Sequence, residues 1–248
     1  MISTFSPSVR WYADEIMSNE PFSLVRFNDI LRNGCPGVPC KYVPGHKNLG
    51  AEMFRVWAFP KAVQVCRDTV LGTHQHPRYW PAVWHQDNLE RRGWLSVIEK
   101  WLGEHGLLDL TWHHGGVWQQ AVLKGQFHII VRTLREQSLP IVFVGPERTR
   151  PAAERLNADE FITVPPLANH DSIPHIKQSV LAFDYPSVVS FAASIPGKAA
   201  IQQLFPMIGH HSYLIDFGSV WDALCGVKER MYQGDLTPER IELNWEGP

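Results

Sequence analysis

Residues 21–29, PFSLVRFND, join an apolar run to a group of polar side chains, and this stretch decides the fold. The apolar run Phe22–Val25 has the length and composition of a strand that is buried on both faces, as in a parallel sheet. Its carboxyl end is followed by Arg26, Asn28 and Asp29. Because open α/β sheets bind their ligands at that edge, the stretch predicts a binding site directly after this strand.

Three further apolar runs end in small or polar residues in the same way. They are Ile141–Gly145, Val188–Ser194 and Tyr213–Ser219. A single end of this kind is more often an ordinary polar loop than a site. Four of them in one chain favour a common carboxyl edge that carries binding residues.

The rest of the chain alternates helical and strand patterns. Further strands are expected at Val70–Thr73, Leu107–Thr111 and Phe161–Val164, and helices at Ser8–Met17, Leu49–Phe59, Leu89–Trp101, Val117–Gln137, Pro151–Leu156, Ile173–Phe183 and Pro196–Phe205. The Gly/Pro-rich segment Arg32–Lys47 is expected to be an irregular loop over the first strand's carboxyl end. This alternation predicts a single α/β domain over residues 1–248, a doubly wound, mostly parallel sheet with helices on both faces, as in Rossmann-like folds.

Composition and charge limit the classes of protein. The chain has 248 residues, 44% of them hydrophobic and 19% charged, with a net charge of −2. No apolar run reaches the length of a membrane span or a signal sequence, so a cytoplasmic protein without a membrane partner is expected. The charge balance argues mildly against DNA as a partner, because neutralising the phosphate backbone normally needs a basic surface.

Several common nucleotide and hydrolase motifs are absent from the strand ends. The sequence contains no GxGxxG, no GxxxxGK[ST] and no GxSxG. A dinucleotide fingerprint, a P-loop and an α/β-hydrolase elbow are therefore disfavoured.

Aromatic and histidine side chains are unusually frequent, with ten tryptophans and twelve histidines. Trp112 and Trp118 belong to a cluster of tryptophans that either packs in the core or offers flat faces to a sugar or a base. His113 and His114 follow a predicted strand and are candidates for a metal ligand or a base, although such histidines are more often packing residues. The cysteines, including Cys35 and Cys40 close to His46, match no standard zinc spacing, so free thiols are expected.

Taken together, several segments resemble one family of enzymes. FSLVRFND, the loop with YVPG, IVFVGP, VVSFAASIPGK and LIDFGSVWDALCGVKERMY are similar to glycosyltransferases of the GT-D fold and their bacterial and phage relatives. In that family the first strand ends in a pattern like R-[FY]-G-D-G-E. Arg26, Phe27 and Asp29 match this pattern, whereas Asn28, Ile30 and Leu31 replace its two glycines and its glutamate.

The resemblance implies transfer of a sugar from a nucleotide sugar, with a UDP-sugar favoured, to an acceptor hydroxyl. The acceptor is a glycan or glycoconjugate, or a hydroxymethylated pyrimidine in phage-type DNA. Asp29 is then expected to hold a divalent metal, Mn or Mg. The expected catalytic residues are Asp29, Asp216 and His114; the donor-binding residues are Arg26, Asn28, Gly145, Ser194, Lys198, Gly218 and Ser219; and the acceptor-binding residues are His46, His113, Trp112 and Trp118.

Two alternatives stay open from the residues themselves. With Leu31 in the glutamate position the acidic pair is broken, so the chain could be a catalytically inactive relative that only binds a nucleotide or a glycan. Arg26 and Asp29 could equally form a structural ion pair. Asp216 lies near the end of an apolar run, where a charge is costly unless it is paired, so it is expected to have a partner.

Overall fold

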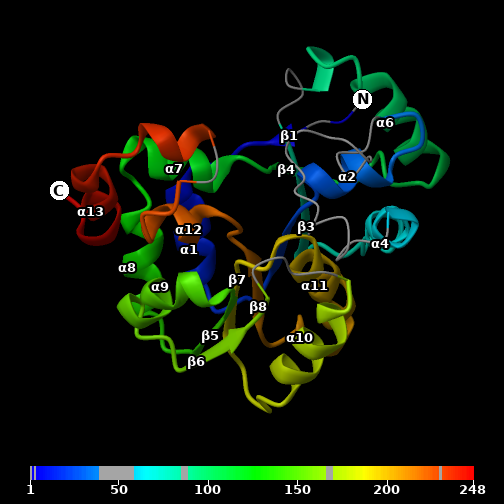
Figure 1. Cartoon of the computed structure of the whole chain (residues 1–248). Coiled ribbons are helices and arrows are strands. Elements are labelled where there is room, and N and C mark those ends of the chain that lie inside the picture. Colours follow the sequence, from blue (N-terminus) through cyan, green and yellow to red (C-terminus); the bar gives the residue numbers. More distant parts are fainter. Residues whose placement is uncertain (1, 3, 39–58, 85–88, 166–169, 229–230) are drawn as a thin grey trace.

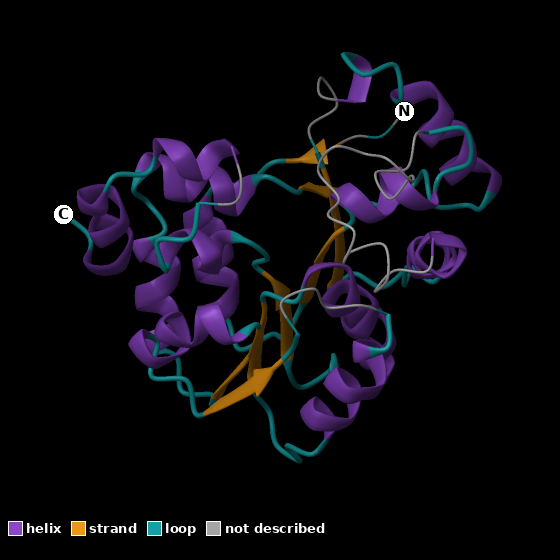
Figure 2. Ribbon diagram, viewed as in Figure 1, coloured by secondary structure: helices purple, strands orange, loops and turns teal. Residues whose placement is uncertain are grey.

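A sheet of eight parallel strands runs through the centre of the molecule (Figures 1 and 2). The computed structural model describes residues 2, 4–38, 59–84, 89–165, 170–228 and 231–248, without the side chains of Asp29, Phe59, Pro60 and Met231. The strand order is β1-β4-β3-β2-β8-β7-β5-β6. The strands are β1 (Thr4–Phe5), β2 (Ser23–Arg26), β3 (Tyr79–Val83), β4 (Trp112–His114), β5 (Ile141–Gly145), β6 (Glu160–Thr163), β7 (Val188–Phe191) and β8 (Tyr213–Asp216). The predicted doubly wound α/β class is confirmed.

Helices cover both faces of this sheet, as the right-handed crossover rule requires (Figure 1). The first face carries α2 (Asn28–Gly34), α4 (Phe59–Leu71), α6 (Leu95–Glu104), α10 (Ser172–Leu181) and α11 (Ser194–Ile208). The second face carries α1 (Val9–Met17), α7 (Val117–Lys124), α8 (His128–Glu136), α9 (Arg150–Arg155), α12 (Val220–Leu224) and α13 (Pro238–Glu246). Two short 3₁₀ helices, η1 (Glu147–Thr149) and η2 (Met231–Asp235), complete the described elements.

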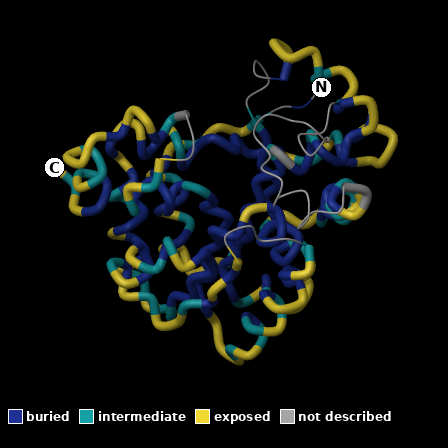
Figure 3. The backbone as a smooth tube through the Cα atoms, in the orientation of Figure 1, coloured by how far each residue is buried: buried dark blue, intermediate teal, exposed yellow. Residues whose placement is uncertain are grey.

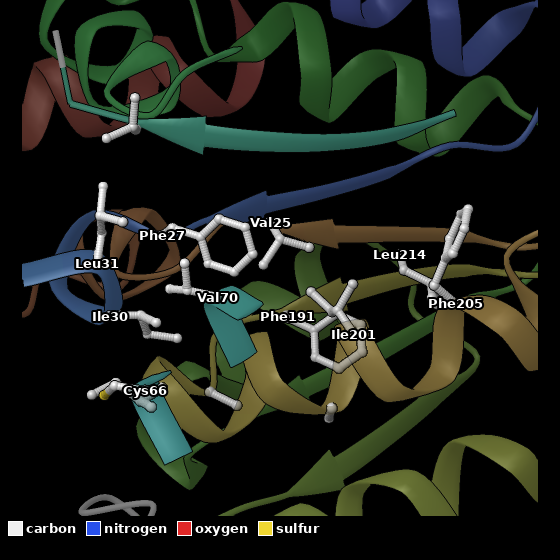
Figure 4. Close-up of a cluster of buried hydrophobic side chains, with 14 of the residues drawn as sticks. Val25, Phe27, Ile30, Leu31, Cys66, Val70, Phe191, Ile201, Phe205 and Leu214 are labelled. Carbon is white, nitrogen blue, oxygen red and sulfur yellow. The ribbon is translucent and has the colours of Figure 1, made fainter. Parts of the chain in front are cut away.

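Each face of the sheet has its own hydrophobic core. Figure 3 shows that the buried residues lie at the centre of the molecule and the exposed ones around it. Along β2, Leu24 packs into the core of the second face and Val25 into the core of the first, because successive side chains of a strand point to opposite faces. Figure 4 shows the first core, where Ile30 and Leu31 of α2 lie close to Val70. Leu31 is only 1% exposed, so the position that holds glutamate in the family pattern here contributes to the core.

Two of the predicted strands are wrong. Val70–Thr73 contains the end of α4, in which Ala62, Cys66 and Val70 recur every four residues and are fully buried. Pro60, expected to end a helix, instead lies in the first turn of α4, where proline costs no hydrogen bond. The predicted strand Leu107–Thr111 ends where β4 begins, at Trp112.

The predicted helix Val117–Gln137 is two helices. Gly125 ends α7 in a left-handed conformation with φ of 69°, and α8 begins three residues later at His128. The helix predicted at Leu89–Trp101 begins later, at Leu95. The helix predicted at Leu49–Phe59 lies outside the described residues apart from Phe59.

Strand β3 was not predicted because it contains a proline. Gly115 N donates to Val83 O, so this side of β3 faces β4. Pro81 lies two residues before Val83, so its backbone nitrogen also faces β4. The pairing between β3 and β4 begins only at Ala82, after Pro81. The missing N–H of Pro81 therefore removes no hydrogen bond from the sheet.

Two further properties concern the described residues. Within them, no helix is both long and apolar enough to cross a membrane. Cys35, Cys66 and Cys225 are free, as expected, whereas Cys40 lies outside the described part of the chain.

Candidate functional site

The connections after two neighbouring strands leave in opposite directions at the centre of the sheet. β2 continues into α2 on the first face, and its neighbour β8 continues into α12 on the second face (Figure 1). Such a switch point leaves a crevice outside the carboxyl ends of the two strands, where open α/β sheets bind ligands. Arg26 ends β2 and Asp216 ends β8, so the sequence placed both at this edge correctly.

The pairing between β2 and β8 stops before these two residues. Their register contains only Ser23 opposite Leu214 and Leu24 opposite Ile215. Beyond it, the backbone N–H of Arg26 donates to the Asp216 side chain, with N 3.2 Å from Oδ2. A carboxylate thus takes the place of a backbone carbonyl where the two strands separate.

Two cations share that carboxylate. Asp216 Oδ2 lies 3.4 Å from Arg26 Nε and 3.1 Å from Lys198 Nζ. Lys198 comes from the first turns of α11, and its ammonium also donates to Ser194 O at 3.2 Å. The exposed fractions are 5% for Arg26, 8% for Lys198 and 1% for Asp216. Asp216 therefore has the partner expected of it, in this pair of cations.

Small residues make room for the cluster. Gly218 has a φ of 61°, and a Cβ there would overlap Arg26 Nη2, so both the backbone and the space call for glycine. Ser194 also has a positive φ, 51°, where the chain turns sharply from β7 into α11. Gly145, at the end of β5, lies against Thr149 and Ala192, where a Cβ would overlap the Thr149 hydroxyl.

Some buried polar atoms at this edge make no hydrogen bond. Among the described residues, Arg26 Nε and Nη1 find no hydrogen-bond acceptor, and Asn28 Oδ1 finds no donor. Leaving a buried guanidinium nitrogen without an acceptor costs free energy, so such groups in native proteins usually mark a missing ligand or water. The acceptors that suit a guanidinium best are the oxygens of phosphates and carboxylates.

Asn28 connects this edge to the end of β4. Its Nδ2 donates to Gly115 O at 3.3 Å, next to His114. The His114 side chain is largely buried, with 8% of the residue exposed. Asn28, His114 and the charge cluster therefore lie along one edge of the sheet, as the sequence predicted.

Three of the predicted acceptor residues are core residues. Trp112 and Trp118 are fully buried, and their Nε1 atoms donate to Leu107 O and Asp216 O. His113 is 2% exposed, and its Nδ1 lies 2.8 Å from the Tyr12 hydroxyl. Burial lowers the pKa of His113 to about 4, so this imidazole is neutral. Neither tryptophan ring therefore offers a face to an acceptor.

The remaining predicted residues fall outside the description. His46 lies outside the described residues, as does the side chain of Asp29, whose backbone belongs to the first turn of α2. Among the described residues, no group of three or more His, Cys, Asp or Glu side chains could hold a metal ion. Asp216 is a poor metal ligand here because two cations already surround it. The described residues do not by themselves fit a metal, and the metal at Asp29 stays a prediction.

A second group of contacts around this site was not predicted from the sequence. In η2, Tyr232 OH donates to Ser219 O at 2.9 Å and Gln233 Nε2 donates to the same oxygen at 3.2 Å. On the other side of the turn, Arg148 Nε donates to Asp222 Oδ1 at 2.7 Å. Short 3₁₀ turns have no periodic pattern, so only the polar composition of 228–235 could have indicated η2.

Comparisons with known proteins place the fold. The sequence significantly matches no protein-family model and no curated protein. Its structure is similar to that of a glycosyltransferase (DUF1792) from Streptococcus sanguinis, with a TM-score of 0.56 and 14% identity over 88% of this chain and 82% of that one. A second structure, of the highly conserved domain of unknown function 1792 with a distinct glycosyltransferase fold, has a TM-score of 0.54 and 12% identity over 88% and 79% of the two chains. This protein therefore has the GT-D-like fold of the DUF1792 glycosyltransferases, with two buried cations and a carboxylate in contact at the switch point of its sheet.

Proposed function

We propose that the protein is a glycosyltransferase that moves a sugar from a nucleotide sugar, with a UDP-sugar favoured, to an acceptor hydroxyl. One observation carries this proposal. Arg26 and Lys198 meet at the Asp216 carboxylate at the switch point, and two buried nitrogens of the Arg26 guanidinium have no acceptor among the described residues. A diphosphate would provide oxygens for these nitrogens and negative charge opposite the two cations.

The chemistry assigns each residue a task. The acceptor oxygen attacks the anomeric carbon, and the bond from that carbon to the diphosphate oxygen breaks. The electron pair leaves on the nucleoside diphosphate, and Arg26 and Lys198 stabilise the negative charge that develops there. Asp216 orients both cations, since it contacts each of them, rather than acting as the base that the sequence suggested.

The base that removes the acceptor's proton is proposed to be Asp29 or His114. Both belong to the same edge of the sheet, at the ends of β2 and β4. A carboxylate or a neutral imidazole can accept a proton when it lies within hydrogen-bond reach of the hydroxyl. Metal chelation tests the predicted ion at Asp29 directly: loss of activity in EDTA that manganese restores would support it.

Donor binding is the first test. Lys198→Met should weaken UDP binding by about 10- to 100-fold, because a charge-assisted hydrogen bond is worth about 1.5–3 kcal/mol. Lys177→Met is the matched control, since Lys177 lies on α10, in the groove facing α11 and away from the cluster. Titration calorimetry measures both. Equal affinity of Lys198→Met and wild type for UDP would contradict the proposed site.

The acceptor is the second test. The wild-type protein is incubated with a panel of nucleotide sugars and with simple glycans, hydroxymethylated duplex DNA or unmodified DNA, and transfer is detected by mass spectrometry. Sugar on the glycan or only on the hydroxymethylated DNA identifies the acceptor class. Tight UDP binding with no transfer and no donor hydrolysis would instead support the catalytically inactive relative that Leu31 permits.

A further inference from the structure

Side chains of η2 form hydrogen bonds with the turn that follows β8, at Ser219. The Tyr232 hydroxyl donates to Ser219 O at 2.9 Å and lies 3.0 Å from Ser219 Oγ. Gln233, which is 1% exposed, donates to the same carbonyl at 3.2 Å. Ser219 directly follows Gly218, and the Arg26 guanidinium packs against Gly218. The hydrogen bonds from η2 therefore reach Ser219, the residue next to the Gly218 against which Arg26 packs.

The positive charge of Arg26 influences the pKa of the Tyr232 phenol. Burial raises the pKa of Tyr232, and the Arg26 guanidinium acts in the opposite direction, as a nearby cation does. The ring therefore lies in the same partly dehydrated region as the charge cluster.

The neighbouring parts of this turn are fixed independently. Before it, Trp118 Nε1 donates to Asp216 O at 3.2 Å. After it, Arg148 binds Asp222 on α12 through a 2.7 Å contact. Gly218 and Ser219 lie between these two anchors, and Gly218 has the most permissive backbone of any residue. Two groups restrain this segment from outside: the Gly218 N–H donates to Phe191 O of β7 at 2.9 Å, and the side chains of Tyr232 and Gln233 hydrogen-bond Ser219.

We propose that Tyr232 is a positioning residue that holds the Gly218–Ser219 turn, and through it the Arg26 guanidinium, in the orientation that receives a diphosphate. The proposal rests on the proposed function for its ligand, but the contact that it describes belongs to the protein alone. Tyr232 acts through Ser219 and Gly218, and it need not touch the donor.

Tyr232→Phe removes the hydroxyl and keeps the ring. Tyr213→Phe is the matched control, because Tyr213 OH also makes a buried hydrogen bond, to Ile16 O at 3.0 Å, but at the amino end of the same strand β8. Both variants lose one tyrosine hydroxyl and the hydrogen bonds that it makes. Only Tyr232→Phe is expected to disturb Arg26.

Two measurements are made on both variants. The first is the affinity for inorganic pyrophosphate and for UDP, which Tyr232→Phe should lower by about tenfold, the equivalent of one well-placed hydrogen bond. The second is the ¹H–¹⁵N resonance of Arg26 Nε, assigned by its disappearance in Arg26→Lys. This resonance should shift or broaden in Tyr232→Phe and stay in place in Tyr213→Phe, a difference that a general loss of stability would not produce.

The outcomes separate this inference from the proposed function. If wild type binds pyrophosphate and UDP, and Tyr232→Phe binds both equally well with an unchanged Arg26 resonance, the positioning role is rejected and the donor site stands. If wild type binds neither probe, the proposed donor site fails, and the Arg26 resonance alone decides: a shift in Tyr232→Phe supports the positioning role, and no shift rejects it. An equal shift in both tyrosine variants also rejects it.

Discussion

At the scale of single residues, Gly218 allows Arg26 to occupy its position. Gly218→Ala should displace the guanidinium and abolish detectable UDP binding, because the new Cβ would overlap Nη2. Gly226→Ala is its control: Gly226 also has a positive φ, 77°, but nothing lies within 4 Å of its Cβ position. Both variants should lose about 1–2 kcal/mol of stability from the left-handed backbone. Unimpaired UDP binding by a folded Gly218→Ala protein, measured by calorimetry, would argue against Arg26 as the diphosphate ligand.

The sequence predicted which polar residues stand at the sheet's edge better than it predicted their roles. Arg26, Asp216 and Lys198 follow or end apolar runs and do meet. Trp118 and His113 were expected to face an acceptor, yet they belong to the core of the second face and to its boundary. A polar atom on a ring does not reveal whether the ring is buried, since a backbone carbonyl or another side chain can satisfy it.

At the scale of elements, β4 depends on one neutral histidine. The His113 ring stacks on Trp80 of β3 with centroids 4.9 Å apart, meets the edge of Phe5 of β1, and contacts the Tyr12 hydroxyl of α1. Burial lowers the pKa of His113 from 6.5 to about 4. Between pH 6.5 and pH 4, therefore, His113 is protonated in the unfolded chain and neutral in the folded chain. The free energy of unfolding therefore receives the full contribution of neutral His113 above pH 6.5. It falls by about 3 kcal/mol as the pH is lowered toward 4.

His113→Asn tests this pH dependence. Asparagine can place an amide near Nδ1 but does not titrate, so the variant should be less stable at pH 7.5 and yet lose less stability than wild type on acidification to pH 5. Urea unfolding at several pH values measures the two slopes. Parallel slopes would show that other groups cause the acid sensitivity.

Most elements were predictable because their patterns are local. The strands on either side of the site, β7 and β8, have apolar runs that only a buried strand explains. β3 and α4 were missed because Pro81 and Pro60 normally interrupt strands and helices. Pro81 is tolerated because β4 does not pair with β3 at that position, and Pro60 because it lies in the first turn of α4. Neither fact can be recognised from the sequence alone.

At the scale of the whole molecule, the charge cluster joins the two halves of the sheet. β2 belongs to one half and β8 to the other, and two residue pairs form their ladder. Asp216→Asn would leave two buried cations without their carboxylate, at a cost of about 3–5 kcal/mol. Asp222→Asn, which breaks a pair with the partly exposed Arg148, should cost about 1 kcal/mol or less. If chemical denaturation gave both variants a similar loss in the free energy of unfolding, the charge cluster would add little to the junction between β2 and β8.

The seam between β2 and β8 also sets the order in which the molecule can be assembled during synthesis. Arg26 and Asp216 are 190 positions apart, so the ribosome must add 190 residues after Arg26 before the carboxylate can reach the guanidinium. Until then the edge of β2 that β8 will cover is an unpaired strand, the kind of edge that attracts other chains. Contacts this distant in sequence close slowly. A nascent chain that stalls before residue 213 therefore carries an open edge and an uncompensated cation at its centre.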